Sequence, residues 1–550
     1  MINFIKKLNL NWFWLILIVG ILVRVWNFGG LPGGLNQDEL ASGYESFSLL
    51  LSGADKWGNN WPIYFPAWGS GQNVLLAYIQ IPFIALFGLN VFAIRLPSLI
   101  IGILTIPLVY LVSKRFFDQK TALVSMLLVA ILPWPIIISR WALESNLLPF
   151  FILFGVYCLS LAWDFKVENV DKSVADKNWL NNFKKLKLWP VLGLIPLALS
   201  VYAYALGFFL VSFFLILILA LNYKSKLKFT SSIVLKSLIP FLVVIFPFLI
   251  FFLKNFVFHS NLGLSSSLPF TIPLLGVNRA DQISVNYVET LAGNIYFLVG
   301  GFVDTILWNN DPSFLPLGMV IFPFLIYGVY YIIKQTKWRE NLILLWFLAF
   351  LPILLMIPMN TTRANSFLLA IILITSFGIV KFAEGLKDLK TAKFAFTAVI
   401  VWIVIYSSTF MVNYFYLYPK KSAASFNAKI ELAMDLAEKN AKVGEKIYLT
   451  QEVSINYLYP VFYKQIDPRD FRQNSTIEYK DGGYNVYNWK NYYFDRKKLD
   501  LKPGQSFVFI LKSCLNEWCD HYGLLYKSDV CKNFTMFEEI DFWRVGRCYT

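Results

Sequence analysis

Long apolar runs, separated by short polar segments, fill the first three quarters of the chain. About 11 of these runs have the roughly 20-residue length with which a helix crosses a hydrocarbon core of about 30 Å. They cover residues 12–28, 95–113, 121–138, 146–163, 188–204, 206–222, 232–253, 314–333, 341–358, 364–381 and 394–412. Because backbone groups in lipid must hydrogen-bond to one another, this pattern predicts a polytopic α-helical membrane protein.

The apolar segment 74–90 is shorter than these runs and contains Pro82. If it lies flat in the membrane interface, the lysine-rich loops at 6–7, 114–120, 166–187, 224–228, 334–339 and 381–393 all fall on one side. That asymmetry is typical of the cytoplasmic side of a membrane protein. We therefore expect a multi-pass protein of the cytoplasmic (plasma) membrane with a cytoplasmic N-terminus. The loops 29–94 and 254–313 and the C-terminal tail would lie outside.

The last quarter of the chain has a different pattern, with polar and apolar residues mixed. The stretch "SFNAKIELAMDLAEKNA" has helical spacing, whereas "EKIYLT" and "QSFVFILK" are typical of strands. We predict a membrane domain over residues 1–413, followed by a small extracytoplasmic α/β domain over residues 414–550.

Most of the cysteines lie in this predicted C-terminal domain, at Cys514, Cys519, Cys531 and Cys548. The spacing of the first three, with His521 between them, fits no standard zinc finger. Outside the cytoplasm, two disulfides are the better interpretation, and three pairings remain open.

Composition agrees with the membrane assignment, since 57% of the residues are hydrophobic and only 15% are charged. The formal net charge of +15 would suit a nucleic-acid partner. However, the lysines cluster in the short loops between apolar runs, so the charge reflects membrane topology. We expect membrane lipids as neighbours and no nucleic acid.

Charged side chains near the outer ends of the predicted spans are the candidates for chemistry, because ionisable groups at a membrane are costly and often functional. They come from separate loops that meet on one face of the bilayer. Arginine suits a lipid phosphate there, since its fork donates hydrogen bonds in pairs and keeps its charge. The candidates are Asp38, Glu39, Asp55, Arg140, Glu144 and Arg363.

Structural alternatives exist for several of these residues. Asn36 followed by Glu39 matches a capping box, which would begin a helix with Leu40, Ala41, Tyr44, Phe47 and Leu51 facing the membrane. Asp38 is explained less well by capping. Arg140 could pair with Glu144 four residues later, and Arg95 could contact lipid headgroups.

The order of these features resembles a known family. A first span is followed by "DE" at Asp38 and Glu39, by "GAD" at residues 53–55, by "LFGLNVFAIRLPSLIIGILTIPLVYLVSKRFF" and by "SRWALESNLLPFF". This order is similar to the GT-C membrane glycosyltransferases, and most similar to the bacterial protein O-mannosyltransferase and aminoarabinose-transferase branch. Residues 10–160 carry the resemblance well, and the remainder follows it in topology only.

The resemblance implies an outward-facing, inverting enzyme that takes a sugar from a polyprenyl-phosphate carrier. The acceptor would be a hydroxyl of a glycolipid, a protein or a cell-wall polymer. By this resemblance Asp38 is the catalytic base with Glu39 in support, and Arg140 and Arg363 bind the carrier phosphate. Asp55 and Glu144 are possible substrate contacts, although relatives often have Asp where Glu144 stands.

Metal-binding histidines known in part of this family have no secure counterpart here. We therefore assign no metal ligands, and a divalent cation stays open as a cofactor. Two other functions fit the same composition. A lipid-linked oligosaccharide polymerase or ligase would share the outer charges but not the early "DE" loop. A lipid or glycan transporter would be expected to show an inverted repeat, which we do not find.

Overall fold

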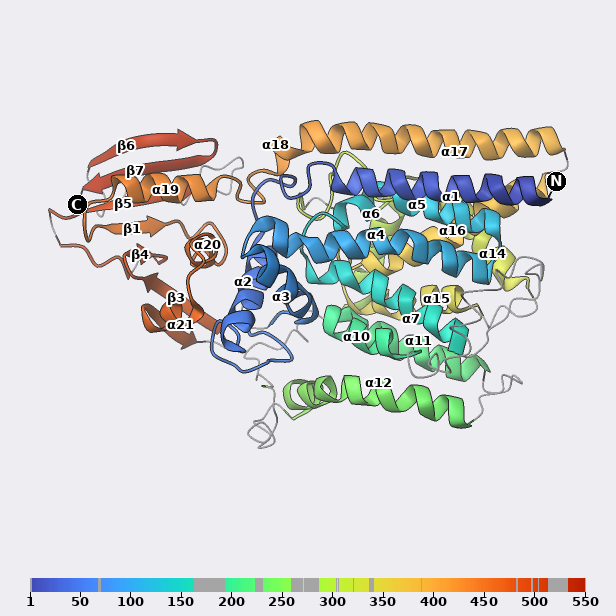
Figure 1. Ribbon diagram of the computed structural model, residues 1–550, viewed down its shortest axis with the longest axis horizontal. Coiled ribbons are helices and arrows are strands. Elements are labelled where there is room, and N and C mark those ends of the chain that lie inside the picture. The colour runs from blue at the N-terminus through green and yellow to red at the C-terminus, as the bar shows by residue number, and fades with distance from the viewer. Residues whose placement is uncertain are drawn as a thin grey trace.

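The computed structural model describes residues 2–67, 71–162, 193–222, 231–258, 271, 286–302, 304, 306–319, 321–335, 341–386, 388–480, 483–495, 498–502, 504–512 and 533–549. A bundle of long helices forms one end of the molecule and a sheet domain forms the other (Figure 1). The N-terminus lies at the far end of the bundle, and the C-terminus lies in the sheet domain.

The bundle contains the predicted membrane helices, which run side by side along the longest axis (Figure 1). They are α1 (Ile2–Val25), α4 (Val91–Phe116), α5 (Gln119–Ile131), α7 (Leu148–Ala162), α10 (Ile195–Ala203), α11 (Leu206–Asn222), α12 (Ser231–Phe252), α14 (Ile321–Ile333), α15 (Leu342–Met356), α16 (Asn365–Gly385) and α17 (Leu389–Val412). Each predicted span overlaps one of them. The span 121–138 is broken after Ile131, and the short α6 (Pro133–Ile138) begins with a proline, which suits a first helical position.

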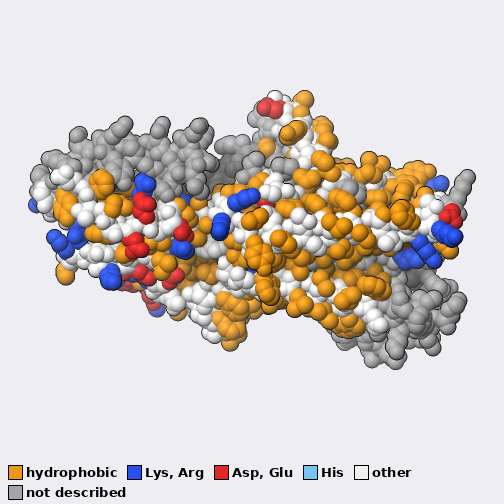
Figure 2. Space-filling view, turned by 90° about the horizontal axis from the view of Figure 1, so that it is seen from above, with side chains coloured by type: hydrophobic (Ala, Val, Ile, Leu, Met, Phe, Trp, Pro, Cys, Tyr) orange, Lys and Arg blue, Asp and Glu red, His pale blue; other side chains and the backbone are white. Residues whose placement is uncertain are grey.

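Burial within the bundle matches a protein surrounded by lipid. Helix α16 is buried over nearly its whole length, whereas α12 and α17 expose large apolar side chains such as Val243, Phe394 and Ile405. Five of the described apolar segments are long enough to cross a bilayer, and several shorter apolar helices pack beside them. Apolar side chains cover the middle of the molecule, and charged side chains gather toward its two ends (Figure 2). The chain is therefore a polytopic membrane protein, and the number of crossings stays a prediction.

Two helices run across the end of the bundle that faces the sheet domain (Figure 1). They are α2 (Gln37–Ser52) and α3 (Leu75–Phe87). Helix α3 coincides with the segment 74–90 that we expected to lie flat in the interface. It is only 13 residues long and contains Pro82, and it packs against α2, α4 and α10.

The described residues of the sheet domain form seven strands in the order β2-β3-β4-β1-β5-β7-β6. Their bounds are β1 (Lys446–Leu449), β2 (Ser475–Lys480), β3 (Gly483–Trp489), β4 (Tyr492–Tyr493), β5 (Ser506–Lys512), β6 (Asn533–Ile540) and β7 (Trp543–Tyr549). Strand β1 is parallel to both neighbours, and the remaining pairs are antiparallel. Helices α19 (Ile430–Asn440), α20 (Leu458–Tyr463) and α21 (Pro468–Gln473) complete the domain. The predicted helix and both predicted strands correspond to α19, β1 and β5.

The sheet domain shares an apolar core with the first loop of the membrane domain. Leu40 and Tyr44 of α2 and Ile94 of α4 belong to the same buried cluster as Ile447 and Val508 of the sheet. The Tyr44 hydroxyl donates a hydrogen bond of 3.0 Å to the Ile466 carbonyl oxygen. This continuous core fixes α2 between the two parts of the molecule.

The cysteine predictions are only partly covered. Cys158 is buried and free, as expected for a residue within a span. Cys548 is buried in β7 and is disulfide-bonded. Cys514, Cys519, Cys531 and His521 lie outside the described residues, so their pairing stays open.

Candidate active site between the bundle and the sheet domain

The sequence "LPGGLNQDEL" forms the tight entry into α2. The side chain of Asn36 accepts a hydrogen bond from the Asp38 N–H at 3.0 Å. In return, the Glu39 carboxylate accepts one from the Asn36 N–H at 3.2 Å. The predicted capping box is therefore confirmed. Gly34 has φ +80°, and a Cβ there would lie 2.3 Å from the Phe426 carbonyl oxygen, so only glycine allows the sheet-domain segment to approach this loop.

Glu39 is fully buried and makes more contacts than a cap requires. Arg95 of α4 donates to both of its carboxylate oxygens, at 2.7 Å and 2.8 Å, and the Ala142 N–H donates at 2.7 Å. The remaining donors of Arg95 bind the carbonyl oxygens of Gly29, Pro32 and Gly34. A bidentate, fully paired ion pair of this kind fixes geometry. Arg95 is 0% exposed, so the predicted headgroup contact is wrong.

Arg140 is also fully buried, and its partners are main-chain carbonyl groups. Its terminal nitrogens donate to the carbonyl oxygens of Val23, Arg24, Asn27 and Leu31 at 2.6–3.3 Å. The guanidinium faces the rings of Tyr414 and Phe415, at 5.8 Å and 5.2 Å from their centres. It does not form the helical pair with Glu144 that we considered, because the chain between them is not helical.

Beside it, Arg24 of α1 uses the same kind of partner. Its terminal nitrogens donate to the carbonyl oxygens of Gly20, Val129, Ala130 and Pro135. The Nε atoms of both arginines lack a partner among the described residues. Arg24 thus ties the end of α1 to the end of α5 and to α6, and Arg140 ties it to the segment that follows α6.

Asp38 differs from Glu39 in its surroundings, although the two are adjacent in sequence. Asp38 is half-buried, whereas Glu39 is 0% exposed. The Asp38 carbonyl oxygen accepts a hydrogen bond from the Gln72 side chain at 3.3 Å. The next residue, Asn73, donates its N–H to the Glu144 carboxylate at 2.6 Å. Two consecutive loop residues therefore connect the element that carries Asp38 with the one that carries Glu144.

The same connection extends to Arg363. Glu144 opens the short helix η1 (Glu144–Leu147), and the side chain of Asn365 donates to Ser145 Oγ and Asn146 Oδ1 in that helix. Asn365 begins α16, two residues after Arg363. The Arg363 guanidinium is part-exposed, and its one described bond runs to the Pro358 carbonyl oxygen at 2.7 Å. The structure therefore brings the elements that carry Asp38, Glu144 and Arg363 together.

Asp55 has a local structural role. It is 0% exposed, and its carboxylate accepts hydrogen bonds from the N–H groups of Trp57 and Asn59 and from the Asn59 side chain. Burial raises the pKa of this carboxyl above its usual value, against the effect of these donors. Its bonds hold the turn that follows α2.

The apolar face of α2 corrects a prediction. Leu40, Ala41 and Tyr44 were expected to face the membrane, yet all three are buried, and Leu40 and Tyr44 pack against residues of the sheet domain. Much of the covering surface comes from residues more than 380 positions later, so a local pattern could not reveal it. Only Leu51, at the far end of α2, is exposed as expected.

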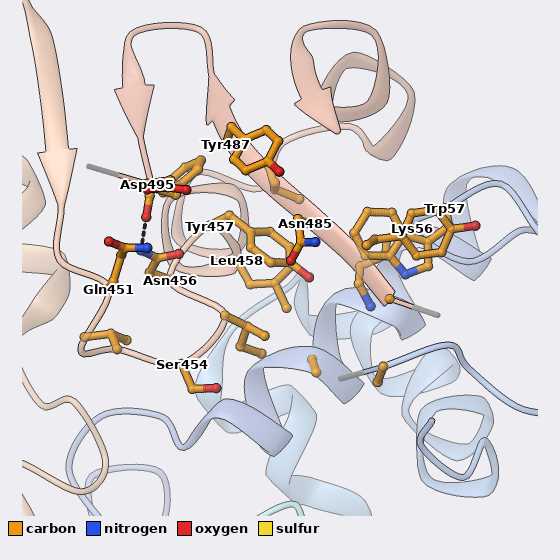
Figure 3. A pocket seen from close by; sticks show the side chains of 18 of the residues that line it. Lys56, Trp57, Gln451, Ser454, Asn456, Tyr457, Leu458, Asn485, Tyr487 and Asp495 are labelled. Carbon is orange, nitrogen blue, oxygen red and sulfur yellow. Dashed lines mark hydrogen bonds between the residues drawn. The ribbon is translucent and has the colours of Figure 1, made fainter. Parts of the chain in front are cut away.

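A cavity of about 500 Å³ lies between this loop and the sheet domain. One wall is formed by Ala41, Lys56 and Trp57, and the other by residues of 451–458, β3 and Asp495. Figure 3 shows Lys56 and Trp57 at one end, Asp495 and Gln451 at the other, and Tyr457 and Asn485 between them. Asp38, Arg140 and Arg363 do not line it, but Ala41 lies one helical turn after Asp38.

Sequence reasoning missed Gln72, Asn73 and the structural role of Arg95. Their contacts join segments far apart in the chain, and a single polar residue in a loop gives no signal of such a contact. Among the described residues, no three His, Cys, Asp or Glu side chains gather as metal ligands would.

Comparisons with known proteins concern the family and the fold of the chain. Residues 72–171 match the family of dolichyl-phosphate-mannose-protein mannosyltransferases, and no curated protein matches the chain. ArnT from Cupriavidus metallidurans, bound to undecaprenyl phosphate, is similar with a TM-score of 0.58 and 12% identity. The similarity covers 98% of this chain and 97% of ArnT. The apo form of the same protein gives a TM-score of 0.56.

The archaeal oligosaccharyltransferase AglB from Archaeoglobus fulgidus, in complex with an inhibitory peptide and a dolichol-phosphate, is similar with a TM-score of 0.51 and 15% identity. That similarity covers 84% of this chain and 64% of AglB, so the chain spans less than two thirds of the archaeal protein. The resemblance to GT-C membrane glycosyltransferases is confirmed, and the chain has their fold.

Proposed function

From this fold, we propose that the chain is an inverting glycosyltransferase. It moves a sugar from a polyprenyl-phosphate carrier to an acceptor hydroxyl at the outer face of the cytoplasmic membrane. The observation that carries the proposal is the position of Asp38. This carboxylate is half-buried at the junction of bundle and sheet domain, on a helix start that the buried Glu39–Arg95 pair holds in place.

Asp38 is the proposed general base. It takes the proton of the acceptor hydroxyl, whose oxygen then attacks the anomeric carbon of the donor sugar. The bond from that carbon to the carrier phosphate breaks, and one displacement inverts the centre. A rigid helix start matters here because reacting atoms must be held close together and in line.

Arg363 is the proposed ligand of the carrier phosphate. The leaving phosphate already carries charge, so a fixed cation stabilises its departure better than a strong acid would. Arg363 is part-exposed, with one described bond, and its chain is tied to the helix that bears Glu144. Glu144 positions the Gln72–Asn73 loop beside Asp38.

Arg140 as a phosphate ligand stays a prediction, and the geometry favours a different role. Its terminal nitrogens would have to release four carbonyl oxygens before they could bind a phosphate. Glu39 likewise acts on Asp38 as a positioning residue, through the helix start. The orientation with the sheet domain outside belongs to this proposal too, and it rests on the lysine-rich loops of the sequence.

The test compares the native protein with Asp38→Asn in reconstituted membranes. It measures sugar transfer from polyprenyl-phosphate donors that carry different radiolabelled sugars. General base catalysis contributes about 10²–10⁴-fold, so the variant should lose transfer by that factor. Its thermal unfolding and its binding of undecaprenyl phosphate should not change. Undiminished transfer by Asp38→Asn would overturn the assignment of the base. Transfer only from oligosaccharide donors would replace the proposed reaction with that of an oligosaccharide ligase.

A further inference from the structure

The cavity between the first loop and the sheet domain is not used by the chemistry proposed so far. Its two walls come from chain segments about 400 residues apart, and they meet because α2 shares the sheet domain's apolar core. With about 500 Å³, it has the size of ligand-binding clefts, which range over about 300–1,000 Å³.

Aromatic rings dominate one part of this cavity. Trp57 of the loop stacks on Tyr484 of β3, with ring centres 4.2 Å apart and planes within 14°. The Trp57 indole N–H donates to the Pro66 carbonyl oxygen, which fixes the ring at the junction. Tyr457 and Tyr487 add further rings (Figure 3). Aromatic faces carry partial negative charge, so they attract the C–H faces of a sugar ring.

Uncharged polar groups lie in another part of the lining. Gln451, Ser454 and Asn485 are exposed at the cavity, and amide and hydroxyl groups both donate and accept hydrogen bonds. Sugar hydroxyls need such two-way partners. These residues therefore suit a ligand rich in hydroxyl groups.

The charges of the lining are close to balanced. The Lys56 ammonium pairs with the buried Glu45 carboxylate, and Lys480 faces the same cavity as Asp495. A polyanion would favour an excess of positive charge. The lining thus favours a neutral glycan.

The position of the cavity relates it to the proposed base. Ala41 lines it and lies three residues after Asp38 in α2, which is about 4.5 Å along the helix axis. A helical side chain leans toward the preceding turn, so Ala41 covers the turn that Asp38 begins. The cavity therefore reaches the helix that carries Asp38, within one turn of it.

We propose that this cavity binds the neutral sugar chain of a glycan acceptor and presents its terminal hydroxyl to Asp38. This inference rests on the proposed function for the direction of transfer, but the binding itself can be measured separately. It selects a glycan over a polypeptide among the acceptors that the sequence left open.

The experiment uses the full chain in lipid nanodiscs. The probes are linear neutral hexose oligosaccharides of two to six units, a sulfated oligosaccharide series and a peptide rich in Ser and Thr. Asn485→Trp is the main variant, because Asn485 is exposed at the cavity and a bulky ring there fills space without disturbing a core. Asn491→Trp is its matched control, since Asn491 is an exposed residue just after β3 that does not line the cavity.

Asn485→Trp should weaken neutral oligosaccharide binding at least tenfold and lower transfer to a glycan acceptor, with undecaprenyl phosphate binding unchanged. Asn491→Trp should match the native protein in all three measurements. A second pair repeats the comparison on the loop. Trp57→Ala removes a ring of the cavity, and Trp61→Ala removes an exposed ring of the same loop that stacks on Tyr78 outside it.

Unchanged oligosaccharide affinity in Asn485→Trp, or no measurable affinity in the native protein, would overturn the inference. Preferential binding of the peptide, lost in Asn485→Trp, would replace the glycan with a polypeptide acceptor. Failure of the proposed function has a different signature. In that case the native protein transfers no sugar from any polyprenyl-phosphate donor, while oligosaccharides still bind and Asn485→Trp still abolishes their binding.

Discussion

Two groups of polar residues meet where the bundle faces the sheet domain, and they differ in how far solvent reaches them. The buried group, Glu39, Arg95, Arg140 and Arg24, is 0% exposed and bonds to carbonyl groups, N–H groups or its own members. The open group, Asp38 and Arg363, is half-buried. Adjacent carboxylates thus have different environments. We propose that the fully buried group holds the structure and that the group within reach of solvent contacts substrates.

The largest stability effect should come from the buried group. Glu39→Gln leaves the Arg95 guanidinium buried without its counter-charge, and breaking a buried pair in this way costs about 3–5 kcal/mol. We expect the free energy of unfolding in detergent to fall by that amount. Asp38→Asn is the matched control, because it makes the same change at the neighbouring carboxylate, which is half-buried. Equal losses of stability in the two variants would remove the distinction between the groups.

The double variant Glu39→Gln, Arg95→Met sharpens this test. Removing both charges leaves no unpaired ion, so the loss of stability should be smaller than the sum of the two single losses. Additive losses would show that Glu39 and Arg95 act independently, contrary to the bidentate contact.

Arg140→Met should have the next largest effect, also on stability. Four carbonyl oxygens lose a charged donor, and a hydrogen bond to a charged group contributes about 1.5–3 kcal/mol. Removing the buried guanidinium also removes its desolvation cost, which offsets most of this loss. We expect a net loss of about 2–3 kcal/mol in unfolding free energy. Weakened undecaprenyl phosphate binding at unchanged stability would instead place Arg140 in the open group, as a phosphate ligand.

The sequence could predict what its local pattern determines. Hydropathy located the apolar segments that became helices, because crossing a bilayer needs a long apolar run. The capping box at Asn36 and Glu39 was correct, since it needs only a spacing of three residues. The same holds for α19, which has helical spacing, and for β5, which is a short continuous apolar run. None of these predictions needed knowledge of a distant contact.

The surroundings of the site residues could not be predicted, because they depend on contacts between residues far apart in the sequence. Arg95 reaches Glu39 across 56 positions, and Tyr44 reaches Ile466 across 422. For this reason α2 was predicted to face lipid when it faces the sheet domain. One indication of these contacts was present in the sequence. Arg24 and Arg95 lie at the ends of apolar runs, where a charged side chain is costly and must have partners.

Arg363→Ala tests the open group. The guanidinium is part-exposed and binds one described carbonyl, so removing it should change the unfolding free energy by less than about 0.5 kcal/mol. Affinity for undecaprenyl phosphate should fall about tenfold, which corresponds to about 1.4 kcal/mol. Arg363→Lys keeps the charge but loses the paired fork, so it should recover only part of the affinity. Loss of stability without loss of carrier affinity would return Arg363 to the structural group.

Glu45 tests whether burial alone separates the two groups. This carboxylate is 0% exposed like Glu39, but its described donors are the ammonium and N–H groups of one residue, Lys56. Burial raises its pKa to about 7, and Asp55 adds to the rise, while Lys56 lowers it. The folded protein therefore holds this proton more tightly than the unfolded chain between about pH 4.5 and pH 7.

The sign of the pH dependence follows from that difference. Between these pH values unfolding releases a proton, so the free energy of unfolding should fall as the pH rises through the window. One proton gives a slope of at most about 1.4 kcal/mol per pH unit. The measurement is the unfolding free energy of the native protein minus that of Glu45→Gln at each pH, which cancels the other titrations. If this difference instead rises with pH or stays flat, the Lys56 ammonium and N–H groups offset the full cost of burying the Glu45 carboxylate.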